Sequence, residues 1–283
     1  MRKKFSLLAL TAVSALALSA CGGGSDDASS SAAPLDPAHP VTVKVAATAV
    51  PQAQILEYVN ENLTEGTGIT LDVTEMDDYV IPNQALNDGE VDANYFQHLP
   101  YLEDEMKNKG YKFEHGAGIH LEPVSLYSKN FKDASEIGDG ATIAITNDAS
   151  NQLRGLKLLQ QAGLLKGIED TDTALDLSGD ANPEKNPKKL KLEEMNPEVV
   201  VQQIDDPKVA AAVVNGNFVL GAKLTLKPIV VESTQDNPYA NLLVWREGHE
   251  TPAIDELEAL LHSDEVKSYI EKTWPDQNVV PAF

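Results

Sequence analysis

The residue types best suited to chemistry gather in one histidine-rich stretch. It holds three histidines and two glutamates, all of them possible metal ligands: His98, Glu114, His115, His120 and Glu122. His115 and His120 are five residues apart, which places them on opposite faces of a strand and outside the i, i+4 spacing of a helical metal motif. The spacing therefore predicts no metal site. We expect each histidine to be polar surface or to form a hydrogen bond with a ligand.

Other reactive arrangements are missing from the sequence. No G-x-x-x-x-G-K-[ST] or G-x-G-x-x-G motif follows a strand, and there is no G-x-S-x-G motif for a nucleophilic serine. The single cysteine, Cys21, excludes disulfides, cysteine-based zinc sites and iron–sulfur clusters, because each needs at least two thiols. We therefore predict no cofactor, no metal and no enzymatic activity.

The composition is that of a folded, acidic protein. The chain has 283 residues, of which 42% are hydrophobic and 23% charged, enough for one large or two modest domains. Its 44 acidic and 22 basic residues give a net charge of −22, which would repel the phosphates of nucleic acids. The composition thus argues against a nucleic-acid partner.

The N-terminus has the pattern of a targeting segment. Three basic residues at 2–4 precede an apolar stretch over 5–18 that is too short to span a membrane, so residues 1–20 are predicted to be a signal peptide. Leu-Ser-Ala before Cys21 resembles the lipobox of bacterial lipoproteins, which implies a lipidated Cys21; the alternative is an ordinary signal peptide and a free thiol. Residues 21–40 are rich in Gly, Ser, Asp and Ala and are predicted to be a flexible tether.

Hydrophobic periodicity predicts an α/β body that begins at Val41. Strand patterns cover 41–45, 69–73, 125–127, 141–145, 209–214 and 229–231. Helical patterns cover 53–63, 81–86, 151–162, 254–261 and 263–274, with Gly89 as a cap. The proline-containing stretch from 171 to 197 is predicted to be a loop. The strand–helix–strand–helix order at the start is typical of a parallel sheet flanked by helices.

Several ordered motifs resemble one known family. They are VPQAQIL (50–56), DYVIPNQAL (78–86), DANYFQHLPYL (92–102), ITNDASNQLR (145–154), VVN (213–215) and PYANL (238–242). Together they resemble the methionine-binding lipoproteins, the substrate-binding components of methionine ABC importers. The resemblance covers nearly the whole body. Residues 118–124 depart from the family pattern, because His120 and Glu122 stand where the family is more apolar.

The resemblance implies a two-lobe, periplasmic-binding-protein-like fold in which each lobe is an α/β sandwich and the ligand lies in the interlobe cleft. Lobe 1 would comprise residues 41–125 and 233–283, and lobe 2 residues 126–232. The chain would cross between them near 124–128 and 231–239.

The resemblance also implies a set of ligand-binding residues: Tyr79, Phe96, His98, Tyr101, Arg154, Asn215 and Asn241. The guanidinium of Arg154 offers a planar fork for a carboxylate, with Asp148 or Ser150 as the cap of its helix; the alternative is an arginine paired with a neighbouring acid. The two asparagines would orient the ends of the amino acid. The aromatic residues would wall a slot for an unbranched side chain, or else be plain core.

The function implied is that of a lipid-anchored monomer on the extracytoplasmic face of the cell membrane. It would bind methionine and deliver it to the permease and ATPase subunits of an ABC importer. Two alternatives remain at this point: binding of a methionine-containing dipeptide, and a role as a surface adhesion or interaction lipoprotein.

Overall fold

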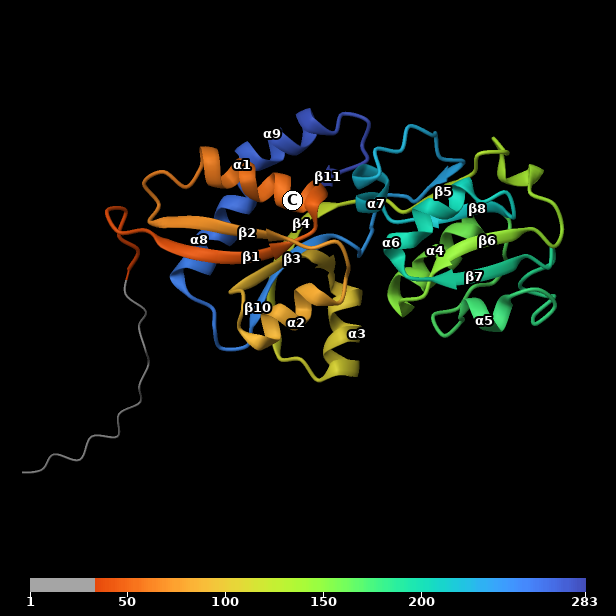
Figure 1. Cartoon of the computed structure of the whole chain (residues 1–283), viewed down its shortest axis with the longest axis horizontal. Helices are drawn as coiled ribbons and strands as arrows, with labels where there is room; N and C mark the ends of the chain where they lie inside the picture. Colours follow the sequence, from red (N-terminus) through yellow and green to blue (C-terminus); the bar gives the residue numbers. More distant parts are fainter. Residues whose placement is uncertain (1–33) are drawn as a thin grey trace, which may run out of the picture. The chain divides into compact units, whose positions relative to one another are not determined.

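The computed structural model describes residues 34–283, which contain two β-sheets, each in a lobe of its own (Figure 1). The first lobe contains β1 (Val41–Ala47), η1 (Ala49–Ala53), α1 (Gln54–Asn62), β2 (Ile69–Glu75), α2 (Ile81–Asp88), β3 (Ala93–His98), α3 (Leu99–Lys109), β4 (Phe113–Leu121), β10 (Asn241–Arg246), α8 (Pro252–Leu261), α9 (Asp264–Thr273) and β11 (Val280–Pro281). The second lobe contains β5 (Ser125–Tyr127), η2 (Ala134–Glu136), β6 (Thr142–Thr146), α4 (Ala149–Gln161), α5 (Ala174–Leu177), β7 (Lys191–Met195), α6 (Pro197–Val200), η3 (Val201–Asp205), β8 (Val209–Val214), α7 (Gly216–Gly221) and β9 (Val230–Val231).

The two sheets are mixed in direction. The first has the strand order β11-β4-β10-β3-β1-β2, in which β1 pairs in parallel with β2 and β3, while β10 is antiparallel to β3 and β4. The second has the order β7-β6-β8-β5-β9, with β6 parallel to β7 and β8. The chain leaves the first sheet after Leu121 and enters the second at Ser125; it leaves again after Val231 and returns at Asn241. Two segments therefore connect the lobes.

Helices cover both faces of the first sheet. Ile55 of α1, Leu257 of α8 and Ile270 of α9 are fully buried in one core with the sheet, because their apolar side chains recur on one side of each helix. Leu86 of α2 and Leu102 of α3 belong to a second core on the sheet with Leu242 and Val244 of β10. These positions leave the ends of β1, β2 and β3 free to face the other lobe.

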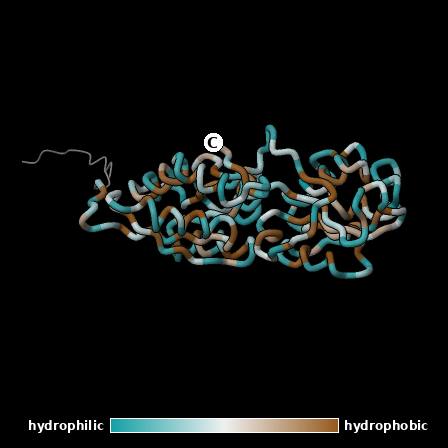
Figure 2. Tube along the Cα trace, turned by 90° about the horizontal axis from the view of Figure 1, so that it is seen from above, coloured by the Kyte–Doolittle hydropathy of each residue, from teal (hydrophilic) through white to brown (hydrophobic). Residues whose placement is uncertain are grey.

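The second sheet is packed in the same way. Leu156 of α4 and Leu177 of α5 share a core with Ile143 and Val213 of the sheet. Residues of α6 and α7 pack with Ala144 and other sheet residues in a separate core. Hydrophobic segments accordingly occur in both lobes rather than in one (Figure 2). The α/β sandwich expected of each lobe is confirmed.

The helices predicted from the sequence are present as α1, α2, α4, α8 and α9, with ends within two residues of the prediction. Gly89 ends α2 with a φ of 76°, a left-handed conformation that suits glycine. The periodicity did not indicate β3, whose residues are buried on both faces and so do not alternate between apolar and polar.

The prediction of a loop over residues 171–197 is wrong. This stretch contains α5, β7 and the start of α6, and β7 pairs with β6 at the edge of the sheet. The fully buried Asn186 holds the stretch together: its Nδ2 donates to the carbonyl oxygens of Leu177 (2.8 Å) and Leu190 (2.9 Å), and its Oδ1 accepts from the Leu190 N–H (2.9 Å). Between α5 and β7 the backbone is thus held by hydrogen bonds to the Asn186 side chain, and apolar periodicity in the sequence cannot detect such bonds.

The N-terminal expectations lie mostly outside the described residues, including the signal peptide and Cys21. Of the predicted tether, Leu35 packs against the first core, so the folded body extends back beyond Val41. Within residues 34–283, no helix combines the length and the apolar character needed to cross a membrane.

Replacing Asn186 by alanine is expected to lower the free energy of unfolding by about 2–4 kcal/mol, because it leaves the Leu177 carbonyl and the Leu190 N–H without a hydrogen-bond partner at about 1–3 kcal/mol each. Urea unfolding monitored by circular dichroism measures the loss. The exposed Asn130→Ala is the control and should change stability little. Equal stability of the two variants would contradict the role assigned to Asn186.

Candidate functional site

A small cavity lies between the lobes, next to the carboxyl ends of several strands. Its volume is about 20 Å³, room for roughly one water molecule. The residues that line it are Tyr79, Phe96, Gln97, His98, Tyr101, Glu122, Asn151, Arg154, Asn215, Gly216, Asn217 and Asn241. Every ligand-binding residue predicted from the sequence is in this set. The fold therefore gathers into one cavity residues that are far apart in the chain.

Three aromatic rings form one wall of the cavity. The ring centroids of Tyr79, Phe96 and Tyr101 lie 5.8–5.9 Å apart in tilted and edge-to-face arrangements. The Tyr101 hydroxyl donates to the Tyr79 carbonyl oxygen (2.9 Å), and the Tyr79 hydroxyl donates to Oδ1 of Asn217 (2.6 Å) in the second lobe. Burial raises the pKa of both tyrosines, so their hydroxyls remain protonated donors at neutral pH.

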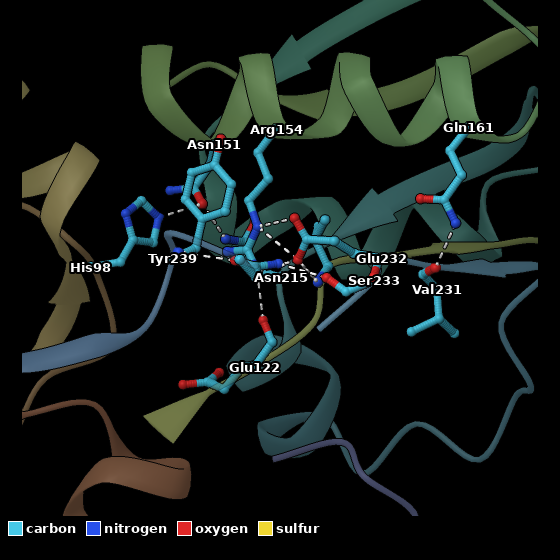
Figure 3. Close-up of polar contacts among 12 residues, drawn as sticks. His98, Glu122, Asn151, Arg154, Gln161, Asn215, Val231, Glu232, Ser233 and Tyr239 are labelled. Atoms are coloured by element: carbon cyan, nitrogen blue, oxygen red, sulfur yellow. Dashed lines mark hydrogen bonds and ion pairs between the residues drawn. The ribbon is translucent and has the colours of Figure 1, made fainter. Parts of the chain in front are cut away.

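Arg154 extends from α4 and lines the cavity, with its side chain 4% exposed (Figure 3). Its Nε donates to both carboxylate oxygens of Glu232 (2.8 and 3.0 Å), and its Nη2 donates to Oε2 of Glu232 (2.5 Å) and to the Glu122 carbonyl oxygen (2.7 Å). The Tyr239 ring covers the guanidinium, with its centroid 4.5 Å from Cζ. Among residues 34–283, none accepts a hydrogen bond from Nη1.

This geometry changes the expectation for Arg154. The fork predicted to meet a ligand carboxylate is already engaged by the carboxylate of Glu232. The arginine is thus paired with an acid and part of the cavity wall, but it is buried rather than on the helix surface, and its partner is 78 residues away rather than a neighbour. Nη1 remains as the donor that can serve a ligand.

His98 is buried in the cavity wall and is held in one tautomer. Its Nδ1 accepts from the Tyr101 N–H (3.2 Å), so its protonated Nε2 donates to Oδ1 of Asn151 (3.1 Å). Burial, followed by the positive charge of Arg154, lowers the pKa of His98 to about 3. Protonation of Nδ1 would also place two N–H donors, those of His98 and Tyr101, against each other. His98 is therefore a neutral group at physiological pH.

Side-chain amides complete the site. Asn215, at the end of β8, donates through Nδ2 to Oδ1 of Asn151 (2.8 Å), and Asn241, at the start of β10, accepts from Nε2 of Gln52 (3.2 Å). Asp148 caps α4 by accepting from the Asn151 N–H (2.9 Å), as predicted. The side chains of Asn151, Asn215 and Asn241 are each 8% exposed or less. Burial and these hydrogen bonds together fix the orientation of the amides.

Glu122 is the most consequential residue that the sequence analysis did not assign to the site. Its Oε1 accepts from Nε2 of Gln52 (2.6 Å) and is 2.8 Å from Nε2 of His120, and it is 5% exposed. His120 is fully buried and also hydrogen-bonds Tyr95, so it is neither polar surface nor part of the cavity lining. The departure from the family pattern at these two positions was the available signal.

Gln97, Asn151, Gly216 and Asn217 also line the cavity without having been predicted, since their positions depend on the packing of two lobes. Gly216 lies so close to Glu122 that a Cβ there would be 2.8 Å from the Glu122 Cβ.

Among residues 34–283, no set of three His, Cys, Asp or Glu side chains is arranged to hold a metal ion.

Two α/β lobes, joined by two segments and enclosing a polar and aromatic cavity, define a substrate-binding protein of the periplasmic-binding-protein type. The chain belongs to the NlpA lipoprotein family, whose model matches residues 43–283.

Similar proteins carry more specific names. The methionine-binding lipoprotein MetQ of Bacillus subtilis is 40% identical over 286 residues, covering 99% of this chain and 98% of that protein. The D-methionine-binding lipoprotein MetQ of Salmonella typhi is 33% identical, covering 93% of this chain and 92% of that protein. A nutrient binding protein from Burkholderia cenocepacia, solved bound to methionine, is 35% identical with a TM-score of 0.75, covering 85% of this chain and 100% of that chain.

The low pKa of His98 predicts an acid-sensitive fold. Between pH 6.5 and about 3 the unfolded chain binds a proton at His98 that the folded protein does not, so stability falls as the pH falls. The contribution lost between pH 7 and pH 5 is about 2 kcal/mol. His98→Gln should lose less stability over this interval than His249→Gln, an exposed control, in urea unfolding at both pH values. Equal losses would contradict the prediction.

Proposed function

We propose that this chain binds methionine in the cavity between its lobes and delivers it to an ABC importer. The family and the names of the similar proteins support the proposal. The observation that carries it is that one cavity combines an arginine, a carboxylate and an aromatic wall. A free amino acid with an unbranched apolar side chain has a carboxylate for the arginine, an ammonium group for the carboxylate and an apolar chain for the aromatic wall.

The charged groups of the cavity suit the two ends of a zwitterion. Nη1 of Arg154 would donate to the ligand carboxylate, with Asn215 as a neutral partner beside it. Glu122 directs Oε1 toward Gln52 and His120, and no residue of 34–283 donates to its Oε2, which would accept from the ligand ammonium. Asn241 would help to orient this end. The proposed roles thus follow from which atoms are already engaged.

The aromatic wall suits the methionine side chain. Tyr79, Phe96 and Tyr101 present ring edges and faces to the cavity, and a thioether sulfur packs against such edges with a gain of about 0.3–1.5 kcal/mol. His98 would add an uncharged ring to this wall, since both of its ring nitrogens already form hydrogen bonds with Tyr101 and Asn151. A charged side chain would have no partner at this wall, which favours an apolar ligand.

Ligand entry requires the lobes to separate, because a cavity of about 20 Å³ is too small for an amino acid. We propose that residues 41–121 with 241–283, and residues 125–231, move as two bodies about the connecting segments 122–124 and 232–240. The hydrogen bonds from Tyr79 to Asn217 and between His98 and Asn151 join the lobes and would break on opening.

The proposed setting is the extracytoplasmic face of the cell membrane. Lipidated Cys21 would anchor the mature chain as a monomer, and residues 22–34 would give its body reach. The partners would be the permease and ATPase subunits of the importer.

A ligand panel tests the binding proposal. At a hundredfold excess over Kd, L-methionine should stabilise the fold by about 2.7 kcal/mol, measured as a rise in Tm. Norleucine should bind about 1–3 kcal/mol more weakly, since it replaces sulfur by methylene in an otherwise similar shape. Glutamate and lysine should not bind. N-acetylmethionine should fail as well, because it leaves Glu122 without a cationic partner.

Three outcomes would change the proposal. Preference for glycyl-methionine would make a dipeptide the ligand of the same site. Preference for a charged amino acid would show that the aromatic wall is not the side-chain pocket. If no amino acid or dipeptide shifts the Tm, a surface interaction lipoprotein becomes the better account.

Anchoring is tested separately. Cys21→Ser should move the protein from the membrane fraction to the soluble fraction without changing methionine affinity, because the anchor is remote in sequence from every residue of the cavity. Ser19→Ala, which keeps the cysteine, is the matched control and should stay with the membrane. Membrane retention of Cys21→Ser equal to that of the control would overturn lipid anchoring at this residue.

A further inference from the structure

Glu232 occupies a position that none of the proposed ligand contacts explains. It follows β9 directly, on the segment that returns the chain to the first lobe, and does not line the cavity. Besides its bonds from Arg154, its Oε2 accepts from the Val124 N–H (3.2 Å), and its own N–H donates to the Val124 carbonyl oxygen (3.0 Å). Val124 belongs to the outward segment. One carboxylate therefore joins the two connecting segments to the arginine of the cavity.

We propose that Glu232 is a positioning residue that aligns Arg154 for the ligand carboxylate; this rests on the proposed function. A guanidinium is planar, so a carboxylate that engages its Nε and Nη2 also fixes the direction of Nη1. The Tyr239 ring restrains one face of the same plane. Arg154 cannot turn toward or away from the cavity without breaking these contacts.

The pairing with Glu232 also compensates the positive charge that Arg154 would otherwise bring to the cavity. Glu232 is 14% exposed and Arg154 4% exposed, so their charges compensate each other in a weakly hydrated environment. The ligand carboxylate consequently meets a directed N–H donor rather than an isolated positive charge. Recognition of the carboxylate then depends on the orientation of Arg154, and through Val124 on the arrangement of both connecting segments.

The experiment compares L-methionine with L-methioninol, which carries a hydroxymethyl group in place of the carboxylate. Glu232→Gln replaces one accepting oxygen by an NH₂ group that faces the donors of Arg154. Calorimetry should show methionine affinity falling 10- to 100-fold and methioninol affinity changing less than threefold. Glu194→Gln is the matched control, since Glu194 accepts from Gln152 on the same helix as Arg154; it should leave both affinities unchanged.

A double-mutant cycle tests whether Glu232 acts through Arg154. In an Arg154→Gln background, Glu232→Gln should have no further effect on methionine affinity. If Glu232→Gln does not fold, Glu232→Asp keeps the charge, shortens the side chain and should still reduce the preference for methionine over methioninol. A preference unchanged within threefold in the folded variant, or additive effects in the cycle, would overturn the inference. Failure of the wild type to bind methionine at all would instead refute the proposed function.

Discussion

The ion pair between Arg154 and Glu232 is the interaction on which the site depends. Taking a guanidinium out of water is costly, and removing one partner of such a pair typically costs about 3–5 kcal/mol because a buried charge is left uncompensated. Glu232 compensates Arg154 with a carboxylate that is itself tied to the other connecting segment at Val124. The arginine can thus be kept inside the protein, and its free edge can be directed at the cavity.

The sheet topology explains why polar groups converge on this cavity. β1, β2 and β3 run in parallel, as do β6 and β8, and the carboxyl ends of parallel strands leave polar loops and helix starts at one edge of a sheet. His98 ends β3, Asn215 follows β8, and Asn151 lies in the first turn after β6. When the two lobes face each other across the connecting segments, these edges meet.

The cavity is polar, but most of its polar side chains are uncharged at neutral pH. Its histidine is neutral because burial and Arg154 oppose protonation, its tyrosines stay protonated because burial opposes ionisation, and its amides bond to one another. The lining residues with charged side chains are Arg154 and Glu122, and Arg154 contacts Glu122 through the backbone carbonyl oxygen rather than the carboxylate. With Arg154 paired to Glu232, its Nη1 is left to donate to a ligand carboxylate and the Glu122 carboxylate to accept from a ligand ammonium, which would suit a zwitterion with an apolar side chain.

The sequence by itself determined the family and a part of the elements. Apolar periodicity located the strands and helices that bury one face, such as α1 and α4, and the ordered motifs pointed to the residues that line the cavity. It did not locate β3, whose residues are buried on both faces, or the ordering of residues 171–197 by Asn186. Only the tertiary structure decided the partner of Arg154, because Glu232 lies 78 residues away and local patterns carry no information on such pairing. The same holds for Glu122, whose role follows from the buried neighbours that the fold places around it.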